Sequence, residues 1–181
     1  MITDTCSSFH PLITRWFLER FGKPTDLQEK AWPAIAAGEH VLLCAPTGSG
    51  KTLAAFLWSL NQLLTRTWPL ERTSVLYVSP LKALNYDIQR NLLEPLDELS
   101  LVFKREKEFF PEIKVLTRSG DTPASDRRRM VRHPPEILIT TPESLNLLLS
   151  SPRARENMRS LQTVRQDPGR TSDPGTDNAC G

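Results

Sequence analysis

A glycine-rich segment carries the residue types that hold nucleotide phosphates: Ala45-Pro46-Thr47-Gly48-Ser49-Gly50-Lys51-Thr52. Glycines in such a loop let successive backbone N–H groups converge on phosphate oxygens, and the helix that begins there adds the positive potential of its N-terminus. In this pattern the Lys51 ammonium reaches the β- and γ-phosphates and the Thr52 hydroxyl binds Mg²⁺. The strict pattern begins with glycine, and Ala45 stands in that place. Because an apolar run precedes the loop and a helical pattern follows it, a chance glycine turn is disfavoured.

A phosphate-binding loop alone fits kinases, transporters, GTPases and helicases, so other residues must choose among these classes. Gln28 lies upstream, in Pro24-Thr25-Asp26-Leu27-Gln28. A glutamine amide can pair with both the donor and the acceptor on the edge of adenine. Thr25 and Gln28 also match a T-x-x-Q capping box, which stabilises a helix N-terminus and needs no nucleotide. The residues alone leave both interpretations open.

Three further segments combine residues that are typical of turns and helix N-termini with charged side chains. Two of them follow apolar runs, and the ends of parallel strands are where such sheets bind ligands. The third precedes a basic cluster that could follow a phosphate backbone. A structural alternative exists for each, namely a capped helix with an exposed lysine or a solvated helix face. The segments are Ser79-Pro80-Leu81-Lys82-Ala83-Leu84-Asn85, Thr140-Thr141-Pro142-Glu143-Ser144-Leu145, and Ser119-Gly120-Asp121 with Arg127, Arg128, Arg129 and Arg132.

The elements that must position these residues follow from the spacing of apolar side chains. Short apolar runs predict buried strands at residues 41–44, 75–78, 113–117 and 137–140, and Leu161 to Val164 resembles the start of another. Helical spacing or helix-start signals predict helices over residues 11–21, up to Gly38, 53–64, after Ser79-Pro80, 97–110, after Thr122-Pro123 and from Thr141-Pro142 through Leu149. Strand alternating with helix predicts an α/β fold, with a parallel sheet between two layers of helices.

Three of the predicted helices begin with a hydroxyl residue followed by proline: Ser79-Pro80, Thr122-Pro123 and Thr141-Pro142. The hydroxyl can accept a hydrogen bond from a free N–H group of the first turn, and proline at the first helical position loses no hydrogen bond. We therefore expect the same cap at all three helix starts.

Composition and charge limit the function classes only weakly. The 181 residues suffice for one domain with a hydrophobic core. The formal net charge of +2 is compatible with a nucleic-acid binder and with a metabolic enzyme, so it does not separate these two classes. Cys6, Cys44 and Cys180 form no metal-ligand or disulfide pattern, and Cys44 is expected in the core because it lies in an apolar run. No apolar stretch reaches the roughly 18 residues of a membrane span. The N-terminal residues show no targeting pattern, so we expect a cytoplasmic protein.

Taken in order, these segments resemble the first RecA-like domain of superfamily-two DEAD/DEAH-type helicases. The resemblance rests on Pro-Thr-x-x-Gln, Ala-x-Thr-Gly-Ser-Gly-Lys-Thr, Ser-Pro-Leu-Lys-Ala-Leu and Thr-Pro-Glu-Ser-Leu. Within these helicases, residues 79–91 and 119–149 are most similar to the large helicase-related (Lhr) proteins. The resemblance covers about residues 8–164, so it implies a partial helicase ATP-binding domain over residues 1–164.

The resemblance also implies roles for individual residues. Gln28 would recognise adenine, and Phe9 is the candidate aromatic residue that would cover it. Lys51 and Thr52 would take part in catalysis, with Thr52 on Mg²⁺. ATP and Mg²⁺ would be held by Thr47, Gly48, Ser49, Gly50, Lys51 and Thr52, and a single-stranded or partly duplex DNA (or an RNA) would lie along Pro80, Lys82, Ala83, Gly120, Thr141, Pro142 and Glu143.

The family pattern breaks near Arg165. A strand ending in Asp-Glu-x-His should follow, whereas the sequence continues Gln166-Asp167-Pro168-Gly169-Arg170 and holds no Asp-Glu pair there. One nucleotide later in the reading frame, codons for Gln-Asp-Pro-Gly-Arg-Thr can spell Arg-Ile-Leu-Asp-Glu. We therefore hypothesise a frameshift near Arg165. Residues 165–181 lack large apolar side chains and are expected to be disordered.

Three hypotheses remain after these observations. The first is the ATP- and DNA-binding part of an Lhr-like helicase, which lacks the second RecA-like domain and cannot hydrolyse ATP or unwind by itself. The second is a small phosphoryl-transfer enzyme such as a metabolite kinase, although no arginine-rich lid with an acidic partner is evident. The third is a non-catalytic binding module, or a degenerate remnant without function. With the sheet incomplete, uncovered strand edges would also favour aggregation.

Overall fold

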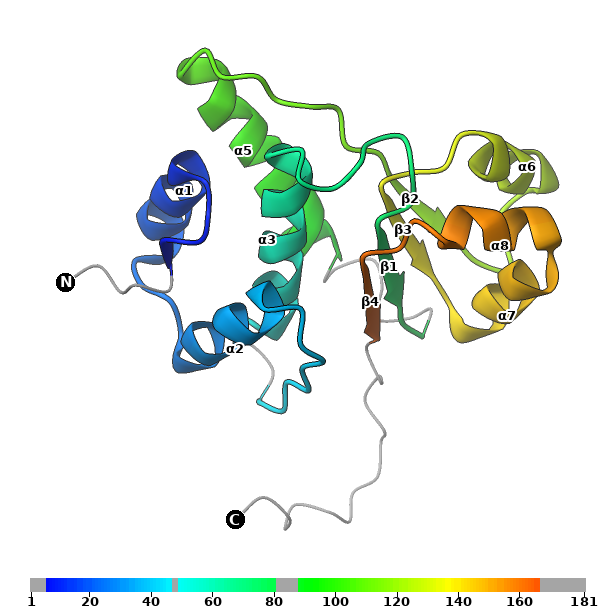
Figure 1. Ribbon diagram of the computed structural model, residues 1–181, viewed down its shortest axis with the longest axis horizontal. Coiled ribbons are helices and arrows are strands. Elements are labelled where there is room, and N and C mark those ends of the chain that lie inside the picture. Colours follow the sequence, from blue (N-terminus) through cyan, green and yellow to red (C-terminus); the bar gives the residue numbers. More distant parts are fainter. Residues whose placement is uncertain (1–5, 47–48, 81–87, 167–181) are drawn as a thin grey trace, which may run out of the picture.

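A computed structural model of the chain describes residues 6–46, 49–80 and 88–166, and Figure 1 shows the arrangement. The helices are α1 (Pro11–Phe21), α2 (Asp26–Ala36), α3 (Lys51–Leu64), a π-helical turn (Gln89–Leu93) that leads into α5 (Glu94–Arg105), α6 (Ala124–Arg132), α7 (Pro142–Ser150) and α8 (Pro152–Met158). The strands are β1 (Val75–Val78), β2 (Val115–Arg118), β3 (Ile137–Thr140) and β4 (Thr163–Gln166).

The strands form one parallel sheet in the order β2-β3-β1-β4. β1 and β3 occupy the centre and are buried along their whole length, as continuous apolar runs require. Their bounds match the predicted strands at 75–78 and 137–140. Since all four strands run the same way, their carboxyl ends lie at one edge of the sheet. The segments that follow β1, β2 and β3 therefore begin at that edge.

Helices cover both faces of the sheet and create two hydrophobic cores (Figure 1). On one face, Tyr77 and Ile139 pack with apolar residues of α1, α2, α3 and α5. On the other face, Leu76 and Leu138 pack with residues of α7 and α8, and Val131 of α6 lies against this smaller core. The alternation of strand side chains between the two cores confirms the three-layered α/β fold.

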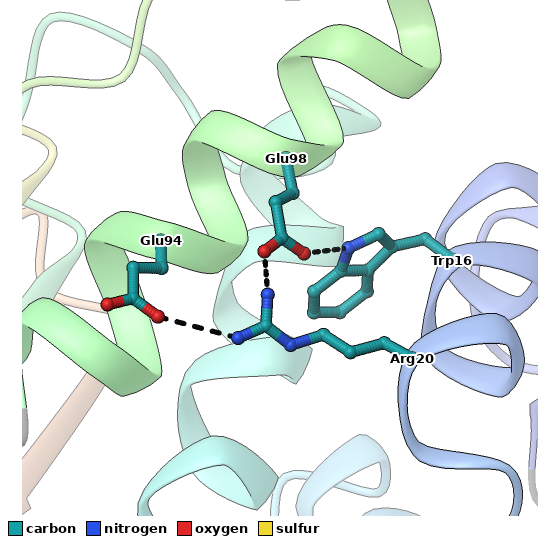
Figure 2. A network of polar contacts seen from close by, with 4 residues as sticks. All are labelled: Trp16, Arg20, Glu94 and Glu98. Carbon is teal, nitrogen blue, oxygen red and sulfur yellow. Dashed lines mark hydrogen bonds and ion pairs between the residues drawn. The ribbon is translucent and has the colours of Figure 1, made fainter.

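A polar network joins α1 to α5 at the periphery of the larger core (Figure 2). The Trp16 indole N–H donates to Glu98 at 2.7 Å, and the Arg20 guanidinium binds both Glu98 and Glu94. Glu94 and Glu98 are one helical turn apart, so one arginine reaches both carboxylates. The network fixes how the N-terminal helix docks on α5.

The apolar run before the phosphate-binding loop does not form the predicted strand. Residues 41–46 have no regular structure, Leu42 is 87% exposed, and Cys44 is exposed rather than in the core. A buried strand needs a pairing neighbour and a cover on each face, and no strand in the described part of the chain pairs with this run. At the nearest edge of the sheet lies β4, whose outward residue Val164 is 60% exposed.

Other predicted elements differ from the structure in detail. β2 begins at Val115 rather than Ile113, and α5 ends at Arg105, before the predicted residue 110. α6 starts without the predicted cap, because the Thr122 hydroxyl instead accepts a hydrogen bond from the Ser119 N–H at 2.8 Å. The helix predicted directly after Ser79-Pro80 falls on residues outside the described ranges.

Arg165 and Gln166, which we assigned to the tail, form the end of β4. The rest of the predicted tail, residues 167–181, lies outside the described residues. Among the helices that the structure describes, none has the length and apolar character needed to cross a membrane.

Candidate nucleotide and nucleic-acid sites

The phosphate-binding loop ends at Gly50, which is the N-cap of α3. Gly50 has a φ of 83°, in the left-handed region that favours glycine, and its carbonyl accepts the first helical hydrogen bond from Ala54 at 2.9 Å. Among the described residues, no side chain caps this helix. The N–H groups of its first turn therefore point toward the loop and remain available to an anion.

The space beside Gly50 is also occupied, so that a larger residue there would displace the end of the Gln28 side chain. A Cβ atom built on Gly50 would lie 2.6 Å from the Gln28 side-chain nitrogen, much closer than real carbon atoms approach. The loop and the start of α2 are thus packed directly against one another.

The capping box at the start of α2 is confirmed. The Thr25 hydroxyl accepts from the Gln28 N–H at 3.3 Å, and the Gln28 side-chain oxygen accepts from the Thr25 N–H at 3.0 Å. The same two side chains hold the loop, because Thr25 donates to the Ser49 carbonyl and the Gln28 amide donates to the Gly50 carbonyl. Gln28 is only 3% exposed, so recognition of adenine by Gln28 stays a prediction.

The loop residues fit a phosphate group. The Lys51 ammonium lies inside the loop, where it donates to the carbonyls of Ala45 and Pro46. The Ser49 hydroxyl is buried and has no partner among the described residues. A buried hydroxyl without a partner is costly, and a phosphate oxygen would satisfy it. Thr52 follows on the first turn of α3 and is partly exposed, whereas Thr47 and Gly48 lie outside the described residues.

Arg165 makes contacts with α3 and β1 that the sequence did not predict. From β4 its guanidinium donates to the Lys51 carbonyl at 3.0 Å and lies over the rings of Phe56 and Tyr77. This side chain ties the sheet to the first turn of α3. No sequence pattern marked it, because we placed it at the start of the tail.

Phe9 does not have the predicted role. Its ring is 7% exposed and packs edge-on against Trp32 and Trp58, with centroid distances of 4.9 and 5.6 Å. A ring buried in the core offers no face to a base. The prediction that Phe9 covers the adenine is therefore wrong.

The segments predicted to contact nucleic acid do gather at the carboxyl edge of the sheet. The registers Arg118↔Thr140 and Val78↔Thr140 align the ends of β2, β3 and β1, and the Ser79 N–H donates to the Thr140 carbonyl at 3.1 Å. Gly120, Thr141-Pro142-Glu143 and Pro80 follow these three strand ends in that order across the sheet. Lys82 and Ala83 lie outside the described residues.

At the start of α7 the predicted cap is confirmed. The buried Thr141 hydroxyl accepts from the Ser144 N–H at 3.3 Å, and Pro142 occupies the first turn. Pro142 and Glu143 are exposed. A strand passing this edge would meet the helix N-terminus and these two exposed residues, while the Thr141 hydroxyl serves the helix.

Arg127 braces the loop that contains Gly120. Its guanidinium donates to the Gly120 carbonyl at 2.9 Å and to the Thr122 carbonyl at 2.7 Å. Burial lowers the pKa of the Arg118 guanidinium, and the positive charge of Arg127 lowers it further. The charges of Arg118 and Arg127 therefore act on one another where β2 leads into α6.

For Mg²⁺ the described residues supply only a partial site. No group of three or more histidine, cysteine, aspartate or glutamate side chains in the described ranges could hold a metal ion. Mg²⁺ commonly keeps waters and binds through substrate phosphates and one or two protein ligands. The Thr52 hydroxyl beside a bound phosphate fits that arrangement.

Comparison with known proteins agrees with this geometry. A family model described as DEAD/DEAH box helicase matches residues 25–166. The chain is 50% identical over 165 residues to the Lhr helicase/probable uracil glycosylase of Mycolicibacterium smegmatis, and 48% identical over 163 residues to the Lhr helicase/uracil glycosylase of Escherichia coli. These alignments cover 91% and 86% of this chain but only 11% and 10% of the relatives. The chain therefore spans about a tenth of the length of these relatives.

The fold is also similar to a solved structure. The Mycobacterium smegmatis helicase Lhr, bound to single-stranded DNA and AMP-PNP, superimposes with a TM-score of 0.83 and 49% sequence identity. The match covers 91% of this chain and 21% of that chain.

Proposed function

The chain belongs to the DEAD/DEAH box helicase family, and on that premise we propose that it is the ATP-binding and nucleic-acid-binding N-terminal part of an Lhr-like ATP-dependent DNA helicase. The observation that carries the proposal is the packing of the phosphate-binding loop between Gln28 and the uncapped start of α3. The first-turn N–H groups, the Lys51 ammonium and the buried Ser49 hydroxyl all belong to this loop and to the helix start that follows it. A triphosphate is the ligand that such a set of donors suits.

We propose that the nucleotide is ATP with Mg²⁺. Ser49, Gly50 and Lys51, with Thr47 and Gly48, would hold the phosphates, and Thr52 would hold the metal ion. Gln28 would pair with the adenine edge after giving up its hydrogen bond to the Gly50 carbonyl. When bound, Mg²⁺ neutralises charge on the phosphate oxygens.

We propose that the second ligand is a DNA strand, single-stranded or partly duplex, at the carboxyl edge of the sheet. The strand would lie along Pro80, Lys82, Ala83, Gly120, Thr141, Pro142 and Glu143. Of these, Thr141 is the residue that caps the start of α7. The similar Mycobacterium smegmatis helicase carries single-stranded DNA, which supports DNA over RNA. Helix starts and small residues let a phosphate backbone approach closely without reading bases.

The chain by itself should hold ATP without hydrolysing it. No Asp-Glu pair follows residue 149 in its sequence, so a carboxylate that activates water is not supplied by a motif of that type. Turnover and unwinding would then depend on groups from other protein segments, including a second RecA-like domain. The 1–164 boundary of the ATP-binding domain belongs to the same proposal.

Hydrolysis and DNA-binding assays on the purified chain test the proposal, with Lys51→Ala as the control. We expect binding of labelled single-stranded DNA and no DNA-stimulated release of phosphate. DNA-stimulated hydrolysis that Lys51→Ala abolishes would contradict the inactivity of the isolated chain. Transfer of phosphate to a small metabolite would instead identify a phosphoryl-transfer enzyme.

A further inference from the structure

The four arginines of α6 divide into two groups with different surroundings. Arg127 is partly buried and bound to the carbonyls of Gly120 and Thr122. Arg128, Arg129 and Arg132 are exposed, and none of the ion pairs among the described residues involves them. The predicted basic cluster thus consists of one arginine that holds the Gly120 loop and three exposed arginines without an ion pair among the described residues.

The three exposed arginines lie on one face of the helix. Together with Ser125 and His133 they line an open surface depression. Positions three and four apart are neighbours on a helix, so the guanidinium groups repel one another. A bound polyanion would relieve that repulsion. We call this surface, formed by Ser125, Arg128, Arg129, Arg132 and His133, the arginine ridge.

Packing of the core does not account for the ridge. α6 contains no buried residue, and only partly buried side chains such as Val131 rest on the smaller core. Even so, the helix is firmly placed. Arg127 fixes it to the Gly120 loop on one side, and the Asn157 amide donates to the Val131 carbonyl at 2.9 Å from α8 (Figure 1). The ridge therefore holds a fixed position relative to Gly120.

We propose that the arginine ridge is a second anchor for the phosphate backbone of the nucleic acid that passes Gly120. This inference rests on the proposed function, since it extends the predicted track along the sheet edge onto α6. Guanidinium groups bind phosphate oxygens in a bidentate manner, and three of the five ridge residues are arginines. The lining residues include no tryptophan, tyrosine, phenylalanine or aliphatic side chain, whereas large apolar anchors are common at the centre of protein–protein interfaces. The chemistry of the ridge thus favours a nucleic acid over an acidic protein.

The test compares two triple variants of the full chain. Arg128→Gln/Arg129→Gln/Arg132→Gln removes the ridge charges and keeps good helix-forming residues. Lys104→Gln/Arg105→Gln/Lys107→Gln is the matched control, since it removes three exposed positive charges at and just beyond the end of α5 that form no ion pair among the described residues. Circular dichroism establishes that both variants keep the wild-type fold. Fluorescence anisotropy with labelled oligothymidylate, at several salt concentrations, then measures binding.

We expect the ridge variant to bind the oligonucleotide about 10- to 100-fold more weakly at ~0.1 M salt, with a salt dependence reduced by roughly 2 in the log–log slope. The control should stay close to wild type. Equal binding by the ridge variant and wild type would overturn the ridge alone, and so would equal losses in both variants. A wild-type chain that binds no oligonucleotide would overturn the proposed function together with the ridge. Replacing the probe by oligouridylate shows whether the same anchor holds RNA.

Discussion

At the residue scale, Gly50 is where the loop, α3 and Gln28 meet, and it combines two separate constraints. The first is its left-handed φ of 83° and the second is the space that Gln28 takes. We predict that Gly50→Ala costs about 1–2 kcal/mol for backbone strain, with a further loss for displacing Gln28. Urea unfolding and ATP titration measure both effects.

Gly22→Ala is the matched control for that substitution. Gly22 has a φ of 81°, but apart from its chain neighbours no atom of the described residues lies within 4 Å of the position of a Cβ. Alanine there carries only the backbone strain. Equal losses of stability at the two sites would show that the contact between Gly50 and Gln28 does not contribute to the free energy of unfolding.

Gln28 also has two possible roles, which nucleotide selectivity separates. Gln28→Ala should cost about 1 kcal/mol of stability, since it removes half of the capping box. If Gln28 also pairs with adenine, the variant loses affinity for ATP and keeps its affinity for GTP. Thr25→Ala breaks the other half of the capping box and should leave the ratio of ATP to GTP affinity unchanged. A Gln28→Ala variant with an unchanged ratio would reduce Gln28 to a structural residue.

At the element scale, the docking of α1 depends on Glu98, which binds both Trp16 and Arg20 (Figure 2). We predict that Glu98→Ala lowers the free energy of unfolding by about 1 kcal/mol, since the indole N–H loses its partner while the ion pair is partly screened. Thermal unfolding measures the loss. Arg159→Gln, which breaks an exposed pair with Glu156, should change stability by far less. Losses of similar size would mean that the network does not hold α1.

Elements with strong local patterns could be predicted from the sequence. The central strands β1 and β3 are uninterrupted apolar runs, and α1, α3 and α7 have clear apolar spacing or caps. The phosphate-binding loop at the start of α3 and the Thr25–Gln28 capping box were also predicted, since each is a local motif. These features depend on neighbours that are close in sequence.

Features that depend on distant partners could not be predicted. Residues 41–44 have the composition of a buried strand, yet strand formation needs a paired neighbour and covered faces. The Thr122 hydroxyl accepts a hydrogen bond from the Ser119 N–H instead of capping α6. The Phe9 ring packs against Trp32 and Trp58 in the core. Arg127 and Arg165 act through contacts across the fold, which no local pattern encodes.

At the scale of the whole molecule, the edge of the sheet at β4 is the surface that we expect to promote association between copies of the chain. Val164 is 60% exposed, and no strand among the described residues pairs with the outer side of β4. An uncovered apolar strand edge promotes association between copies of a chain. We predict that Val164→Lys reduces light scattering by concentrated samples.

Leu101→Lys serves as the control for this effect. Leu101 is similarly exposed, at 55%, but lies on α5 rather than on a strand edge. An equal reduction from Leu101→Lys would indicate that general hydrophobicity, and not the strand edge, drives association.

The central claim is that the loop before α3 binds ATP through Lys51. Isothermal titration of the purified chain with ATP and Mg²⁺ tests it most directly, beside Lys51→Ala under the same conditions. We predict saturable binding at one site by the wild-type chain and at least about tenfold weaker binding by Lys51→Ala, the loss of a charge-assisted phosphate contact. Binding of equal strength by both proteins, or no binding by the folded wild-type chain, would contradict the account.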